Sequence, residues 1–120
     1  RTPAIGAFEG HDGEVLDLAW SEDKLLVSAG TDRCVRLWHP SSDRCLRVFQ
    51  HPQIATGVAF HPVQQQLLVT GCLDGIVRLF DLRPAHDAPA DTAVSEVDTK
   101  GFVTALAVSD DGRTVAAGLF

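Results

Sequence analysis

Hydrophobic residues along the chain form short blocks that recur in the same order. The blocks VLDLAW (15–20), ATGVAF (55–60) and VTALAV (103–108) each end in an aliphatic residue, an alanine and a large apolar residue. The block LLVSAGTD (25–32) matches LLVTGCLD (67–74), and VRLW (35–38) matches VRLF (77–80). Because the blocks return after roughly 40 residues, the chain is built from repeats, and the repeat decides the fold.

Each block is expected to form a β-strand, because it is short, rich in aliphatic and β-branched residues and bounded by turn residues. Tight turns are predicted at 110–112 (DDG) and 74–75 (DG), and a fourth strand fits 45–49. The runs 25–27 and 67–69 do not alternate with polar residues, which is typical of strands buried on both faces. The sequence therefore predicts an all-β protein made of units of four antiparallel strands.

The signature residues of these units resemble those of the WD-repeat β-propeller family. GH (10–11) opens one repeat and QH (50–51) the next, while WH (38–39) and FD (80–81) stand where the family has its Trp-Asp pair. The third repeat departs from the pattern, because KG (100–101) lacks the histidine. The resemblance implies blades of four strands packed face to face around a central axis.

We expect the chain to contain about two and a half blades of a larger propeller, seven-bladed as is usual in the family. The first repeat covers about 8–50, the second 51–95 with a loop insertion at about 83–95, and the truncated third 96–120. The sequence contains no Met, so we interpret it as a fragment.

Two sets of polar residues occupy matched positions and invite comparison with a Ser-His-Asp triad. The sets are His11, Ser28, Asp32 and Trp38 in the first repeat, and His51, Thr70 and Asp74 in the second, with Phe80 at the Trp position. A nucleophile is needed once, whereas the set is present twice, and no G-x-S-x-G segment surrounds the serine. The family resemblance implies instead a structural hydrogen-bond network in which His bonds the turn Asp and Ser or Thr links His to the indole. Phe80 cannot donate a hydrogen bond, so the second network should lack its last link.

No metal, cofactor or catalytic site is expected. His39, His51 and His61 fall in different loops or strand ends without zinc-ligand spacing, and the three cysteines form no C-x-x-C pair. A net charge of -6 argues against nucleic-acid binding. No apolar run approaches the ~20 residues that span a bilayer, so direct membrane insertion is not expected.

The function that follows from the resemblance is a non-enzymatic protein–protein interaction scaffold. Within the family the chain most resembles Rab-GTPase-linked scaffolds of membrane traffic, which implies a cytoplasmic protein, peripheral on vesicle membranes, that binds a small GTPase through regions outside these repeats. The alternative is a substrate receptor of a cullin-type ubiquitin ligase, because FDLR (80–83) resembles the W-D-x-R box of such receptors. The same box also fits a surface Asp–Arg pair.

Candidate partner contacts lie where the loops entering the first strands meet the turns between second and third strands. The candidates are Glu14, Asp17, Thr31, Leu73 and Phe102. Leu73 in a tight turn and Phe102 in a loop are apolar residues of the kind that mark binding surfaces. Other repeats have Gly57 and Ala105 at the position of Asp17, so its carboxylate is expected to be free for a partner.

Overall fold

The computed structural model describes residues 10–42, 44–83 and 93–120 of the chain. All the regular elements in these ranges are strands. They are β1 (Val15–Trp20), β2 (Leu26–Gly30), β3 (Cys34–Trp38), β4 (Arg47–Gln50), β5 (Ala55–Phe60), β6 (Leu67–Cys72), β7 (Ile76–Asp81), β8 (Ser95–Asp98), β9 (Val103–Val108) and β10 (Val115–Leu119).

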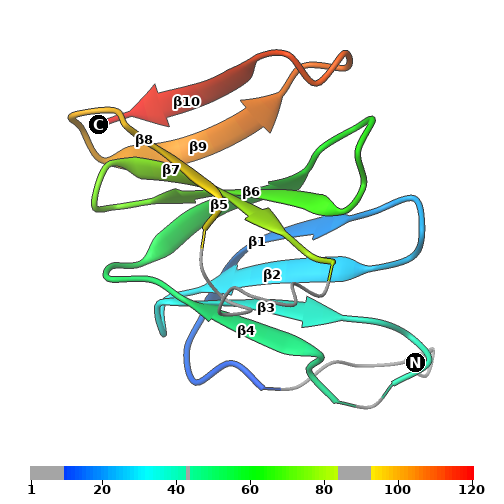
Figure 1. The fold of residues 1–120 in the computed structure, drawn as a ribbon. Helices are drawn as coiled ribbons and strands as arrows, with labels where there is room; N and C mark the ends of the chain where they lie inside the picture. Colours follow the sequence, from blue (N-terminus) through cyan, green and yellow to red (C-terminus); the bar gives the residue numbers. More distant parts are fainter. Residues whose placement is uncertain (1–9, 43, 84–92) are drawn as a thin grey trace, which may run out of the picture.

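The strands form three antiparallel sheets in chain order. Strands β1 to β4 form blade 1, β5 to β8 form blade 2, and β9 pairs with β10 in blade 3. The blades are stacked one on another, and their first strands β1, β5 and β9 are in contact from blade to blade (Figure 1). This arrangement confirms the all-β fold with four-stranded antiparallel blades.

Burial follows the hydrophobic pattern. Every residue of β2 is buried, as expected for a run without polar alternation. Aromatic side chains fill the space between blades 1 and 2, where the rings of Phe49 and Phe80 lie 4.8 Å apart between centroids. The apolar residues of both blades form one core, so neither blade buries its apolar face alone.

Two boundaries expected from the sequence were wrong. The fourth strand of blade 1 begins at Arg47 rather than at 45. The border between the second and third repeats, placed at 95/96, falls inside β8, because Ser95–Asp98 pairs with β7 and completes blade 2. Most of the insertion expected at 83–95 lies outside the described residues.

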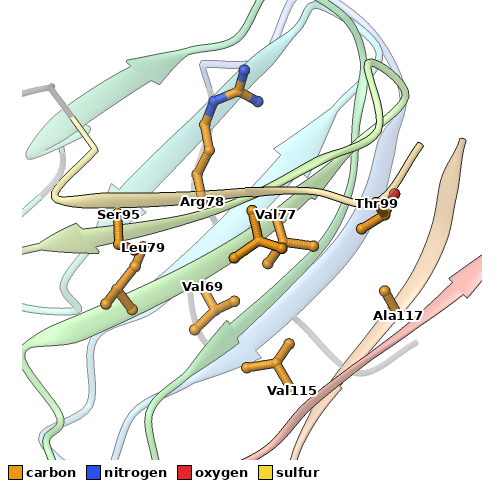
Figure 2. A pocket seen from close by; sticks show the side chains of 9 residues that line it. Val69, Val77, Arg78, Leu79, Ser95, Thr99, Val115 and Ala117 are labelled. Carbon is orange, nitrogen blue, oxygen red and sulfur yellow. The ribbon is translucent and has the colours of Figure 1, made fainter. Parts of the chain in front are cut away.

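Apolar surface remains open on the outer faces of the stack. On β1, Leu16, Leu18 and Trp20 are 44–59% exposed. Between blade 2 and β10 lies an apolar hollow of about 280 Å³, lined by residues that include Val69, Val77 and Val115 (Figure 2). Blade 3 has two strands in the described part of the chain, and the hollow lies beside the edge of β10 that pairs with none of the described strands.

Candidate functional site

The polar network of blade 1 is a continuous chain of hydrogen bonds. His11 Nδ1 lies 3.0 and 3.1 Å from the carboxylate oxygens of Asp32, and His11 Nε2 lies 2.6 Å from Ser28 Oγ. The Trp38 indole N–H donates to the same Ser28 oxygen at 2.8 Å. A carboxylate only accepts, so Nδ1 carries the proton and, in the neutral ring, Nε2 accepts the serine hydroxyl. The structure thus brings the four sequence-selected residues of blade 1 together.

Asp32 is also the anchor of the β2–β3 turn. Its carboxylate accepts the backbone N–H groups of Asp12 and Cys34. Burial alone would raise the pKa of Asp32, but these two N–H donors and His11 together lower it below the usual value for an aspartate. The carboxylate is therefore held in its charged form by the turn that it organises.

This arrangement does not suit nucleophilic catalysis. Ser28 is 3% exposed, and its hydroxyl lies between His11 and Trp38. A substrate carbonyl would have to displace the indole to reach the oxygen. The geometry favours the structural interpretation of this set.

Blade 2 uses the matched residues differently. His51 Nδ1 donates to the backbone oxygen of Phe49 at 3.0 Å, and Nε2 accepts the Thr70 hydroxyl at 2.9 Å. Asp74 is bound instead by Arg78, with Nη2 2.5 Å from Oδ2 and Nη1 3.3 Å from Oδ1. The expectation that His51 would bond the turn Asp was therefore wrong.

Charge and burial explain why Asp74 is bound by Arg78 rather than by His51. The Arg78 side chain is only 9% exposed, and a buried guanidinium needs a carboxylate more than a neutral imidazole does. Burial would raise the pKa of Asp74, but the hydrogen bonds from Arg78 and from the Ile76 N–H outweigh it and lower that pKa. Burial lowers the pKa of His51, which keeps that ring neutral.

Two of the candidate partner residues hold each other in place. The Glu14 N–H donates to Thr31 Oγ1 at 3.0 Å, and the Thr31 N–H donates to the Glu14 backbone oxygen at 2.8 Å. The Glu14 residue is exposed, whereas Thr31 is half-buried. The Thr31 hydroxyl thus fixes the loop that leads into β1, and the Glu14 carboxylate is left at the surface.

Asp17 contradicts the expectation of a free carboxylate. Its Oδ2 accepts the Val58 N–H from blade 2 at 3.1 Å, and its Oδ1 accepts the Leu18 N–H. Among the described strands, β5 pairs with β6 alone, so N–H groups on its other edge need another acceptor. Asp17 fills that role and joins blade 1 to blade 2.

Leu73 and Phe102 line one hollow at the end of the blades where the first strands begin. We call this end the entry end; it carries the loops that lead into β1, β5 and β9 and the turns β2–β3 and β6–β7, all at the left in Figure 1. The hollow has a volume of about 310 Å³, and its lining is Leu73, Asp74, Lys100, Gly101, Phe102 and Phe120. Phe102 is 55% exposed and Leu73 is half-buried.

Several contacts between blades involve residues that sequence reasoning missed. The Thr56 hydroxyl donates to the Val103 oxygen at 2.6 Å, and Arg47 Nη1 donates to the Leu82 oxygen at 3.2 Å. His61 Nε2 lies 3.0 Å from the Gly112 oxygen. The repeat pattern reflects contacts within one blade, so it could not reveal residues that bond a neighbouring blade.

The FDLR box forms the surface pair that the sequence left open. Arg83 Nη2 lies 2.7 Å from Asp81 Oδ2, with the Arg83 side chain 68% exposed. Within the described ranges, no group of three or more His, Cys, Asp or Glu side chains could hold a metal ion. In the same ranges no helix is long and apolar enough to cross a membrane.

Comparison with known proteins gives the family. A family model described as "WD domain, G-beta repeat" matches residues 3–39 and 43–81. An uncharacterized WD repeat-containing protein of Schizosaccharomyces pombe is 37% identical over 111 residues, which cover 92% of this chain and 18% of that protein. WD repeat-containing protein 44 of Xenopus laevis is 43% identical over 75 residues, which cover 62% of this chain and 8% of that protein.

Solved structures agree with these matches. A chain in the crystal structure of the mitotic checkpoint complex superposes with a TM-score of 0.81 at 29% identity, over 96% of this chain and 36% of that one. The C-terminal WD40 domain of Sif2 superposes with a TM-score of 0.78 at 25% identity, over 93% of this chain and 30% of that one. The chain thus spans a small part of its relatives, and it belongs to the WD-repeat β-propeller family, whose members generally act as protein-interaction scaffolds.

Proposed function

We propose that the chain is part of a non-enzymatic scaffold that binds a protein partner at its entry end. The observation that carries this proposal is the hollow lined by Leu73 and Phe102. An aromatic side chain that is 55% exposed beside a leucine is costly to leave in water, and such residues are frequent anchors of interfaces.

The turn that presents Leu73 is rigid, which favours binding. Asp74 accepts the Ile76 N–H, and its carboxylate is held by Arg78. The Leu73 N–H donates to the Ile54 oxygen of the neighbouring loop. A preformed surface loses little conformational entropy on association.

Asp17 and Thr31 are poorer candidates for direct contact with a partner than the sequence suggested. Both side chains are engaged within the protein, so their replacement would disturb the blades as well as a partner. Glu14, Leu73 and Phe102 are the residues best suited to contact a partner directly.

A membrane-traffic role is the more specific proposal. The likeness to WD repeat-containing protein 44 supports a scaffold linked to a Rab GTPase, which acts in the cytoplasm and on vesicle surfaces and binds the GTPase outside this chain. The FDLR box gives little support to the ubiquitin-ligase alternative, because Arg83 pairs with Asp81 of its own blade.

The test compares exposed apolar residues at the two ends. Leu73→Ala and Phe102→Ala are introduced into the longest polypeptide that carries this chain, and partners captured from cell extract are identified by mass spectrometry. Val63→Ala is the matched control, because Val63 is 66% exposed in the turn between β5 and β6 at the opposite end. Loss of an anchor costs about 2 kcal/mol or more of binding, about 30-fold in affinity.

Partners lost with Leu73→Ala or Phe102→Ala and kept with Val63→Ala support the entry end. The opposite result, with folding intact, contradicts it. Among the captured proteins, a Rab GTPase retained by all three variants supports the traffic role, whereas its absence from the unaltered protein's partners argues against it.

A further inference from the structure

One pair of positions recurs at the entry end of all three blades and changes its chemistry from blade to blade. In each blade the residue directly after the second strand donates its N–H to the backbone oxygen of the residue directly before the first strand. The pairs are Thr31 with Glu14 at 2.8 Å, Leu73 with Ile54 at 2.9 Å, and Phe120 with Phe102 at 2.9 Å. The same hydrogen bond thus holds a polar pair in blade 1, an aliphatic pair in blade 2 and an aromatic pair in blade 3.

The apolar side chains of these pairs become more exposed towards blade 3. Ile54 and Leu73 are half-buried, whereas Phe102 is 55% and Phe120 is 91% exposed. The hollow of about 310 Å³ lies between the two apolar pairs, because its lining includes Leu73 of blade 2 and both phenylalanines of blade 3. Exposed apolar side chains gathered around one hollow are typical of a surface that a partner covers.

The two segments that border this hollow are fixed against each other. Gly75 has φ +86°, and a Cβ placed there would lie 2.5 Å from the backbone oxygen of Gly101. The Thr99 hydroxyl donates to the Gly75 oxygen at 2.7 Å. The β6–β7 turn and the loop before β9 are therefore packed backbone to backbone, with glycine required at 75. A preformed hollow of this kind loses little conformational entropy on binding.

Blade 1 carries an excess of negative charge at the same end. Its loops 10–14 and 31–33 contain three acids, with Arg33 as the one base. The carboxylate of Asp32 is bound by His11, whereas Asp12 and Glu14 are exposed. Within the part of the chain that the structure describes, neither exposed carboxylate has a hydrogen-bond or ion-pair partner.

Blades 2 and 3 show no such excess. The segments 51–54 and 73–75 of blade 2 contain one formal charge, Asp74, which is bound by Arg78. In blade 3 Lys100 pairs with Asp98 at 3.2 Å. A segment lying across the entry end would therefore meet an apolar hollow beside blade 3 and unpaired carboxylates at blade 1.

We propose that the entry end binds an extended segment of a partner protein that carries a bulky apolar side chain and, three to five residues away, Lys or Arg. The proposal rests on the proposed function, because it takes the same hollow as the binding site and adds the chemistry of the partner. The apolar side chain enters the hollow beside Leu73 and Phe102, and the basic side chain reaches Asp12 and Glu14.

The spacing follows from the stacking of the blades. Packed sheets lie about 10 Å apart, so Glu14 of blade 1 lies about 10–15 Å from a hollow between blades 2 and 3. An extended chain advances about 3.3 Å per residue and covers that distance in about three to five residues.

Selection of peptides tests the predicted chemistry. The probe is a phage-displayed library of random twelve-residue peptides, selected at low ionic strength on the longest polypeptide that carries this chain. Enriched peptides should combine a bulky apolar residue with Lys or Arg at the stated spacing. The variant Phe102→Ala should lower their affinity about 30-fold. Enriched peptides without basic residues, or a selection that enriches no peptide, would overturn the proposal.

Reversal of one charge is the sharper test. Glu14→Lys is compared with Glu22→Lys, which makes the same change at an exposed acid in the β1–β2 turn at the opposite end. Glu14→Lys should weaken the binding of the selected basic peptides about fivefold and strengthen the binding of copies in which Glu replaces their Lys and Arg. Glu22→Lys should leave both affinities unchanged. Equal effects of the two variants would contradict the proposal.

The outcomes separate this inference from the proposed function. Peptides that need Phe102 but are indifferent to Glu14→Lys would keep the binding site and refute its preference for basic partners. Peptides bound equally well after Leu73→Ala and Phe102→Ala would bind elsewhere, and the proposed function would then fail as well. If Glu14→Lys does not fold, Glu14→Gln keeps the side-chain shape and should weaken the basic peptides in the same direction by a smaller factor.

Discussion

Blades 1 and 2 carry a histidine, a turn aspartate and an arginine at matched positions, yet they pair them differently. In blade 1 the turn carboxylate of Asp32 is bound by His11. In blade 2 the turn carboxylate of Asp74 is bound by Arg78, and His51 turns to a backbone oxygen. Arg36 holds the position of Arg78 in blade 1, and its Nε has no partner in the described part of the chain.

In blade 2 a buried arginine, and not the histidine, binds the turn carboxylate. Arg78 is buried and Arg36 is half-buried, although the Nε atom of Arg36 is itself buried without a partner in the described part of the chain. A buried cation without a carboxylate is far more costly than a neutral imidazole without one. The same sequence motif can thus support the same turn through two different networks.

The largest difference is expected when the turn aspartates are removed. Asp74→Ala leaves buried Arg78 with the longer ion pair to the exposed Glu96, 3.4 Å from Nε, and should cost about 3–5 kcal/mol of unfolding free energy. Asp32→Ala leaves a neutral ring and the N–H groups of Asp12 and Cys34 without their acceptor, but no buried charge, and should cost less, about 2–3 kcal/mol. Urea unfolding of the longest polypeptide that carries this chain measures both, and an equal or larger cost for Asp32→Ala would break the comparison.

The two arginines give the next largest contrast. Arg78→Met removes the ion pair and should cost about 2–3 kcal/mol, because the Asp74 carboxylate stays behind in a poorly solvated site. Arg36→Met removes a donor that bonds no described acceptor, so its cost should be below about 1 kcal/mol. Thermal unfolding can rank the two variants, and the reverse order would count against the account.

The hydroxyls of the two networks differ by one bond. Ser28 serves both His11 and Trp38, so Ser28→Ala should cost about 2 kcal/mol. Thr70 serves His51, and Thr70→Val keeps the side-chain shape, so its cost should be about 1 kcal/mol. Equal costs in urea melts would mean that the indole bond contributes nothing.

Acid should affect the His51 network through the lowered pKa of the folded state. Because burial lowers the pKa of His51, the unfolded chain takes up this proton first as the pH falls. The contribution of His51 to stability is therefore complete above about pH 6.5 and declines as the pH falls towards the pKa of the folded protein. His51→Gln should flatten the dependence of unfolding free energy on pH between 7.5 and 5.5. An unchanged slope would show that His51 does not titrate as its burial implies.

The fold could be predicted from the sequence because the information is local and repeated. The strand-like blocks and turns that recur every 40 residues or so predicted four-stranded sheets, and the non-alternating run of β2 predicted its burial on both faces. The network of blade 1 was equally accessible, since His11, Ser28 and Trp38 match a family pattern in full.

The remaining features depend on how blades meet and how deeply a side chain is buried. The binding of Asp74 by Arg78 could not be inferred, because Arg36 at the matched position does not bind its own turn aspartate. The role of Asp17 was missed for a related reason, because its carboxylate accepts an N–H group of the next blade. One feature of the sequence pointed to His61: it occupies the position that Ser109 holds in the third repeat. Both side chains accept a backbone N–H of their own turn.

The preference of Asp74 for Arg78 over His51 is measured most directly by double-mutant cycles within blade 2. The cycles combine Asp74→Ala with Arg78→Met and, separately, with His51→Gln, and report the coupling free energy of each pair. The account predicts a coupling of about 2 kcal/mol or more between Asp74 and Arg78, and of less than about 0.5 kcal/mol between Asp74 and His51. A larger coupling of Asp74 to His51 than to Arg78 would contradict it.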